Sequence, residues 1–269
     1  MLEQLIFLQE KVVEIVMGFN PVERAKAIER LVVRNSSRLY YKIKFNRYYG
    51  PIISCYTVGC CLNCAYCWNH NKNKNPARFG RFLSPSEVAE RVNRLLKQHG
   101  TIHARITGGE PILGTKSLKH LTEMISEVDR SFLIETNGVM LGYNPDLFDL
   151  LEDVKDRVVL RVSIKGYDCE IFERVTGADG RSLDYVFNCI KELSRRRFYY
   201  WICIMPEVFT GRGIEIIKRK LRKIGYRGHL ELETLETFYS GVMERIRKRG
   251  IELEFGYRDC YIPVCDDAL

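Results

Sequence analysis

The chain has 269 residues, of which 46% are hydrophobic and 28% charged, and its formal net charge is +8. This length and composition are typical of a globular protein with a large core, and they exclude a disordered chain. No apolar run is long enough to span a bilayer, so no membrane partner is expected.

The cysteines indicate metal binding rather than disulfides. Four of the ten fall within residues 60–67, and the others are scattered singly. Such crowding favours metal ligation in a reducing compartment, which predicts a cytoplasmic protein.

The first 49 residues form an N-terminal helical and β extension in this interpretation. An amphipathic helix is expected over 2–17 and a second over 22–33, separated by Gly18 and the helix-breaking Pro21. A β-rich aromatic segment follows over 38–49. The remainder, residues 50–269, is predicted to be the core domain with a short C-terminal tail.

In the core domain, apolar strands alternate with amphipathic helices. Strands are expected at 52–58, 102–107, 132–136, 158–164, 199–205 and 229–234. Ser84 and Glu87 form a capping box that begins a helix over 85–98, and further helices fit 116–128, 145–151, 182–196, 214–224 and 241–248. This order predicts parallel strands joined by right-handed crossovers, and six units are too few for a closed eight-stranded barrel. The predicted fold class is therefore α/β, a partial (β/α)6 barrel.

A cysteine loop follows the first core strand. Cys60, Cys64 and Cys67 have the spacing Cys-x3-Cys-x2-Cys. Thiolates are the usual ligands of iron–sulfur clusters, and three of them leave one iron of a [4Fe–4S] cluster open. Two alternatives remain: a zinc site with His70 as fourth ligand, and a shifted set that uses Cys61 in place of Cys60.

Three more motifs follow the next three strands in order. They are Gly108-Gly109-Glu110, then Glu135-Thr136-Asn137-Gly138, and then Ser163-Ile164-Lys165. Parallel barrels carry their chemistry at the C-terminal ends of the strands, so these motifs are expected to meet near the cysteine loop.

Together the loop and the motifs resemble the radical S-adenosylmethionine (SAM) superfamily over about residues 52–206. Within it, the motifs are most similar to those of the glycyl-radical-enzyme activating enzymes, such as the pyruvate formate-lyase activating enzyme. Ser163 departs from that pattern, because the activating enzymes carry an aspartate there, beside a cation.

The resemblance implies a site and a reaction. It implies that Cys60, rather than Cys61, joins Cys64 and Cys67 in holding a [4Fe–4S] cluster. It implies that the reduced cluster cleaves S-adenosylmethionine to methionine and a 5′-deoxyadenosyl radical, with the electron supplied by a low-potential donor of ferredoxin or flavodoxin type. The cofactor contacts that it implies are Tyr66, Gly108, Gly109, Glu110, Glu135, Asn137, Ser163 and Lys165.

Three interpretations of the substrate stay open. The first is an activase-like enzyme that takes hydrogen from a partner protein. The second is a tRNA- or nucleotide-modifying enzyme, because Trp68-Asn69-His70 with Asn75-Pro76 resembles the wybutosine-type tRNA enzymes and the net positive charge suits an anionic substrate. The third is a non-catalytic iron–sulfur electron-transfer protein.

Strand alternation places charged side chains inside the barrel. The residues expected to point inward are His103, Arg105, Thr107, Arg161, Ser163, Lys165, Glu231 and Glu233. They predict either a solvated, ligand-binding cavity or a set of ion pairs low in the barrel.

Two features outside the motifs also have alternatives. Cys260 and Cys265 are expected to be free or packed thiols, with an auxiliary cluster as the alternative. The basic runs at 195–197, 218–223 and 245–249 are interpreted as solvated helix ends, with an acidic partner or RNA as the alternative.

Overall fold

A single ten-stranded sheet runs through the part of the chain that the computed structural model describes, residues 18–47 and 50–264. The strands are β1 (Val33–Arg34), β2 (Ser37–Asn46), β3 (Ile52–Thr57), β4 (Arg81–Leu83), β5 (Ala104–Thr107), β6 (Phe132–Thr136), β7 (Val158–Ser163), β8 (Tyr200–Ile204), β9 (His229–Leu232) and β10 (Cys260–Pro263). Their order in the sheet is β1-β2-β3-β5-β6-β7-β8-β9-β10, and β4 pairs with β2.

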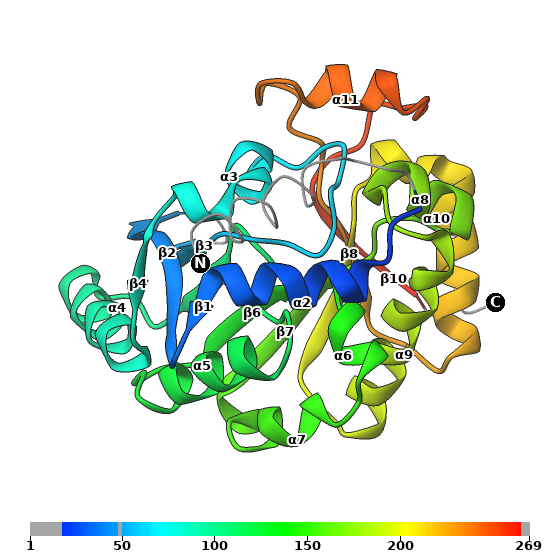
Figure 1. The fold of residues 1–269 in the computed structure, drawn as a ribbon. Coiled ribbons are helices and arrows are strands. Elements are labelled where there is room, and N and C mark those ends of the chain that lie inside the picture. Colours follow the sequence, from blue (N-terminus) through cyan, green and yellow to red (C-terminus); the bar gives the residue numbers. More distant parts are fainter. Residues whose placement is uncertain (1–17, 48–49, 265–269) are drawn as a thin grey trace.

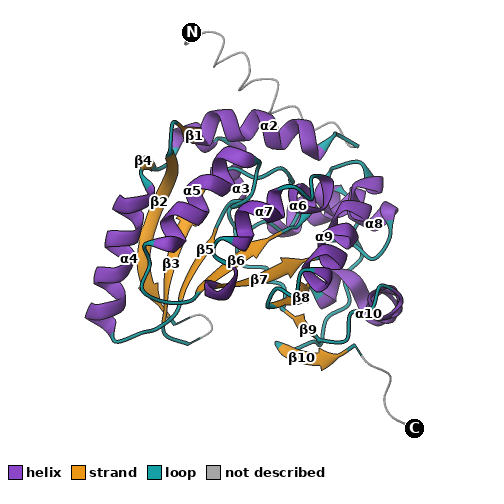
Figure 2. Ribbon diagram, turned by 90° about the horizontal axis from the view of Figure 1, so that it is seen from below, coloured by secondary structure: helices purple, strands orange, loops and turns teal. Residues whose placement is uncertain are grey.

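The strands β3, β5, β6, β7, β8 and β9 are parallel, whereas β2 and β10 flank them in antiparallel pairing. The path does not close on itself, which confirms the partial barrel (Figure 1). Helices lie outside the parallel strands (Figure 2).

The helices are α2 (Pro21–Val32), α3 (His70–Lys74), α4 (Pro85–His99), α5 (Thr115–Ser126), α6 (Val139–Tyr143), α7 (Leu147–Glu152), α8 (Cys169–Thr176), α9 (Leu183–Arg195), α10 (Pro206–Lys223) and α11 (Val242–Lys248). Local chemistry sets their ends. The α4 capping box between Ser84 and Glu87 is present, and Gly100 ends this helix in the left-handed conformation. Val88, Val92 and Leu96 of α4 repeat every four residues and are buried.

All six predicted core strands are present, with ends that differ by two residues or fewer. The helix predicted over 214–224 is longer in the structure, where α10 begins at Pro206. It consists of two helical stretches that join at a bend at Thr210 (φ 59°, ψ 168°). The short elements α3, α6, α8, β1, β4 and β10 were not predicted. The helix predicted over 2–17 lies outside the described residues.

The N-terminal extension packs closely against the core. β2 pairs with β3, and a Cβ added at Gly59, where the cysteine loop begins, would lie 2.6 Å from Ile28 Cγ2 of α2. The division of the chain at residue 50 stays a prediction.

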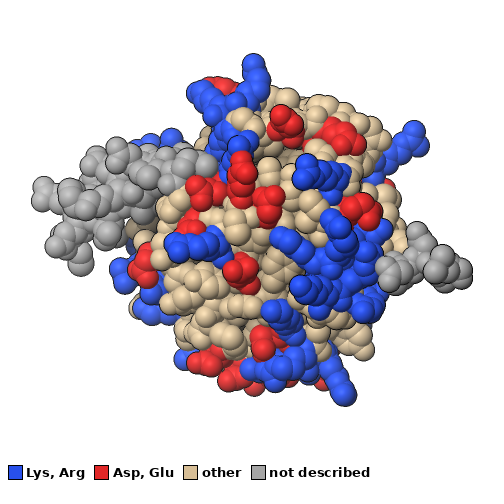
Figure 3. All heavy atoms as spheres, turned by 90° about the vertical axis from the view of Figure 1, so that its right-hand side faces the viewer, with Lys and Arg blue, Asp and Glu red and all other residues tan. Residues whose placement is uncertain are grey.

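The basic runs lie where helices end. Basic residues occupy the last turns of α9, α10 and α11, where they interact favourably with the helix dipole. Lysines and arginines gather on the face at the right of Figure 1, where α10 lies (Figure 3). Several are paired within their own helix, as Arg195 is with Glu192 and Lys218 is with Glu215. For the runs at the ends of α9 and α10 this arrangement agrees with the interpretation as solvated helix ends, whereas Arg245 and Arg249 of the third run donate to backbone carbonyls of other segments.

Within the described ranges, no helix combines the length and the apolar character needed to cross a membrane.

Candidate cluster and cofactor site

A cavity of about 470 Å³ lies at the C-terminal ends of the parallel strands. Its walls include every residue that the sequence analysis assigned to cluster or cofactor: Cys60, Cys64, Tyr66, Cys67, Gly108, Gly109, Glu110, Glu135, Asn137, Ser163 and Lys165. The fold thus brings together residues from the ends of three strands, β5, β6 and β7, and from the cysteine loop. A cavity of this size is in the range that accommodates one small molecule.

Three of the four cysteines in the loop line this cavity. Cys60, Cys64 and Cys67 line the cavity, whereas Cys61 is fully buried and is not among the lining residues. The Asn137 side-chain amide donates to Cys61 Sγ at 3.3 Å. This placement favours the ligand set with Cys60.

The loop is held from outside by arginines that the sequence analysis did not assign to it. Arg245 of α11 donates to the carbonyls of Ala65 (2.9 Å) and Cys67 (3.1 Å), and Arg24 of α2 donates to that of Cys60 (3.3 Å). These contacts span up to 180 residues of sequence, so no local pattern could reveal them.

The donor set fits a cluster better than a single ion. Among the described residues, no three His, Cys, Asp or Glu side chains are grouped so that they could hold one metal ion, and this includes His70. In a cluster each thiolate binds its own iron, so the sulfur atoms need not converge on one point. Burial raises the pKa of Cys64 to about 12 and that of Cys67 to about 11. Metal ligands must be deprotonated, so binding to iron would favour the thiolate form of both.

The turn after β5 lies against the cysteine loop. The backbone N–H of Glu110 donates to Gly59 O (2.8 Å), and the side chains of Asn69 and Asn73 both donate to Gly108 O (2.9 Å each). A Cβ added at Gly109 would lie 2.5 Å from Gly59 O, so the close approach requires glycine.

We expect Gly109→Ala to separate the two loops and to cost about 1–3 kcal/mol of unfolding free energy, as overpacking does. Gly211→Ala is the matched control, because a Cβ there meets nothing closer than 3.8 Å. Chemical denaturation of both variants tests this expectation. Equal midpoints for the two would contradict it.

The Glu110 carboxylate joins the ends of β5 and β6. It accepts hydrogen bonds from the Thr136 hydroxyl (2.6 Å) and from the backbone N–H groups of Asn137 (2.8 Å) and Ile112 (3.1 Å). Arg38, buried beneath the turn, donates to the carbonyls of Glu110 and Pro111. Burial nevertheless raises the pKa of Glu110 to about 7.

This raised pKa predicts a pH dependence of stability. The Glu110 carboxyl binds its proton more tightly in the folded protein than in the unfolded chain. Its contribution is therefore complete below the unfolded pKa of 4.5 and is lost as pH rises through about 7. The loss amounts to roughly 3 kcal/mol. Glu110→Gln should flatten this part of the curve of unfolding free energy against pH, and an unchanged slope would show that other groups cause it.

The remaining predicted contacts lie around the same cavity. Lys165 Nζ lies 5.4 Å from the centre of the Tyr66 ring. Ser163, two residues earlier at the end of β7, is buried. Glu135 forms an ion pair with Arg105 (2.7 Å). The Asn137 amide lies 3.8 Å from Cys60 Sγ as well as near Cys61.

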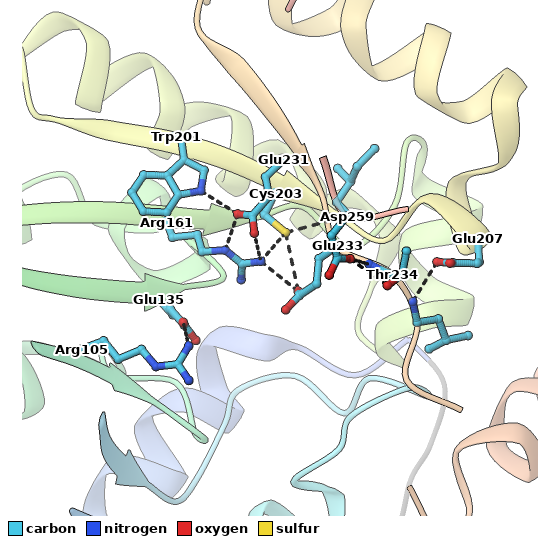
Figure 4. Close-up of polar contacts among 12 residues, drawn as sticks. Arg105, Glu135, Arg161, Trp201, Cys203, Glu207, Glu231, Glu233, Thr234 and Asp259 are labelled. Carbon is cyan, nitrogen blue, oxygen red and sulfur yellow. Dashed lines mark hydrogen bonds and ion pairs between the residues drawn. The ribbon is translucent and has the colours of Figure 1, made fainter. Parts of the chain in front are cut away.

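Arg161, Glu231 and Glu233 form a charged group, here called the lower wall, of which Arg161 and Glu233 line the cavity (Figure 4). Arg161 donates from Nε to Glu231 (2.6 Å) and from Nη2 to Glu233 (3.0 Å) and Cys203 Sγ (2.8 Å). Trp201 Nε1 also donates to Glu231 (2.7 Å). The two alternatives for the barrel interior therefore coexist, because the charges form ion pairs and Arg105, Arg161 and Glu233 also line a cavity.

Two details differ from the sequence prediction. Arg105 pairs with Glu135 of the neighbouring strand instead of a glutamate of β9. His103 does not point inward: it is exposed and precedes β5, which begins at Ala104.

Of the two tail cysteines, Cys260 is not among the residues that line the cavity. Cys260 begins β10 and is exposed, and Cys265 lies outside the described residues. The choice between free thiols and an auxiliary cluster stays a prediction.

Comparison with known proteins identifies the family. Residues 54–215 match the family model described as the radical SAM superfamily. The chain is 31% identical over 228 residues to the GTP 3′,8-cyclase of Actinobacillus pleuropneumoniae, covering 78% of this chain and 64% of that protein. It is also 24% identical over 178 residues to the 7-carboxy-7-deazaguanine synthase of Methanocaldococcus jannaschii, covering 62% of this chain and 69% of that protein. This chain thus spans less than two thirds of the length of the cyclase.

A solved structure shares the fold. Streptococcus suis SuiB superimposes with a TM-score of 0.53 at 17% identity, covering 78% of this chain and 49% of that chain. The motifs, the partial barrel and the match over residues 54–215 agree on one family and on its cofactors, a [4Fe–4S] cluster and S-adenosylmethionine. The chain belongs to the radical SAM superfamily.

Proposed function

We propose that this chain is a radical SAM enzyme that modifies a nucleotide. The observation that carries the proposal is the 31% identity to a GTP 3′,8-cyclase over 78% of this chain. The 7-carboxy-7-deazaguanine synthase is a second relative whose name contains a purine-like base. These relatives favour the nucleotide alternative over the activase-like interpretation, in which the substrate is a partner protein.

The cofactors supply the radical that takes a hydrogen atom from the substrate, once an electron has reached the cluster. Cys60, Cys64 and Cys67 would hold the cluster at the cavity wall. The turn at 108–110, with Asn137 of β6 and Ser163 and Lys165 of β7, would hold S-adenosylmethionine beside it. The reductant is proposed to be a low-potential ferredoxin or flavodoxin.

The protein's own contribution is to orient the substrate and to exclude water from the radical. Arg161 and Glu233 are positioned to contact a polar substrate in the cavity.

The test is a substrate screen on the reconstituted, dithionite-reduced protein with S-adenosylmethionine under anaerobic conditions. GTP, other purine nucleotides, a tRNA pool and glycine-containing peptides are added separately, and 5′-deoxyadenosine is measured. A true substrate should accelerate its formation. Acceleration by peptides alone would favour the activase-like interpretation. A cluster that never supports cleavage would favour an electron-transfer protein.

A further inference from the structure

The cavity contains two pairs of a lysine and an aromatic ring, and only one is accounted for. Lys165 with Tyr66 lies among the residues assigned to the cofactor. The second pair is Lys44 of β2 with Tyr56 of β3, with Lys44 Nζ 6.0 Å from the ring centre. No part of the superfamily motifs includes either residue of this second pair.

Two further rings extend the second pair into an aromatic wall, made of Tyr56, Trp68 and Tyr239. Trp68 meets Tyr56 edge-on, with ring centres 6.1 Å apart at 88°, and it lies 6.1 Å from Tyr239 at 36°. All three line the cavity, and Trp68 is still 41% exposed. Three rings from β3, the cysteine loop and the segment before α11 thus offer apolar surface to whatever enters.

Lys44 places a positive charge beside this wall, and the carboxylate of Glu236, which also lines the cavity, is hydrogen-bonded to Tyr239. Arg105 and Arg161 of the cavity are held in ion pairs with glutamates. In the described part of the chain, no carboxylate lies within ion-pair distance of Lys44, which is exposed at the edge of the cavity. An anionic group bound next to the aromatic wall would meet this ammonium group.

We propose that the aromatic wall stacks the base of a purine nucleotide substrate and that Lys44 binds its phosphate. The inference rests on the proposed function and assigns a place to each part of that substrate. Base–aromatic stacking uses the face of the heterocycle, and Lys binds phosphate as a point charge. The sugar would then lie between the wall and the Lys165 side of the cavity, where the cofactor is expected.

The experiment measures binding as well as turnover. Equilibrium dialysis under anaerobic conditions gives the dissociation constants of GTP, guanosine and pyrophosphate for the cluster-loaded protein with S-adenosylmethionine present. Tyr239→Ala is the main variant, because it is remote in sequence from the cysteine loop. Tyr239→Phe keeps the ring. Tyr199→Ala is the control, because it removes a tyrosine elsewhere that is 71% exposed.

We expect Tyr239→Ala to weaken the binding of guanosine and of GTP by about tenfold, which is the order of magnitude of one lost base–aromatic stack. The binding of pyrophosphate should be unchanged. Tyr239→Phe should bind as the wild type does. Lys44→Met should weaken the binding of GTP and of pyrophosphate but not that of guanosine. Iron content and the visible spectrum confirm that the cluster is intact in each variant.

Three results would overturn the inference. If Tyr239→Ala binds guanosine as tightly as Tyr199→Ala does, the wall does not hold the base. If Tyr239→Ala weakens the binding of S-adenosylmethionine instead, the aromatic wall binds the cofactor. In either case, conversion of a nucleotide by the wild-type protein would still support the proposed function. A wild type that binds neither GTP nor guanosine would overturn both proposals.

Discussion

Cys60→Ala is expected to abolish 5′-deoxyadenosine formation, whereas Cys61→Ala is expected to retain it. The two thiols are neighbours in sequence but face different surroundings. Cys60 lines the cavity together with Cys64 and Cys67, and Cys61 is fully buried against Asn137. Removing Cys60 takes away one of three protein ligands, and loss of a ligand should prevent stable cluster assembly.

The measurement is anaerobic reconstitution followed by iron and sulfide analysis, the visible spectrum and the cleavage assay. Cys61→Ala leaves a small hole in the core, which should cost about 1 kcal/mol of unfolding free energy without loss of iron. Iron loss in Cys61→Ala combined with retention in Cys60→Ala would reverse the ligand assignment and establish the set of residues 61, 64 and 67.

The sequence predicted the parallel strands and the cofactor motifs well because both have local signatures. β6 was predicted to the residue, and the turns at 108–110 and 137–138 follow their strands directly. Strand alternation also predicted that Arg105, Arg161 and Glu231 point inward. It failed for His103 because that residue precedes β5, and alternation has no meaning outside a strand.

The tertiary contacts had no such signature. Arg245 belongs to a basic run that was interpreted as solvated, yet it crosses to the cysteine loop and donates to two carbonyls there. Tyr56, Trp68 and Tyr239 come from three segments, and nothing in their spacing indicates that they meet. The pairing of Arg105 with Glu135 depends on how β5 and β6 are staggered, which the sequence does not specify.

The second large effect is expected at Arg161. Its guanidinium lies between Glu231 and Glu233, and the side chains of Arg161 and Glu231 are 4% and 7% exposed. Arg161→Ala would leave a buried carboxylate without its partner, and breaking such a pair costs about 3–5 kcal/mol. Trp201 would still donate to Glu231, but a neutral indole does not replace the lost charge.

The control is Arg195→Ala, because the Arg195–Glu192 pair lies on the surface, where its loss should change stability little. Chemical denaturation under anaerobic conditions compares the two variants with the wild type. If both lose the same small amount, water or a proton compensates the glutamates, and the lower wall is not a stabilising ion-pair network. If Arg161→Ala loses several kcal/mol, the charged wall contributes to the stability of the barrel, and substitutions that probe substrate binding there need a stability measurement beside every activity.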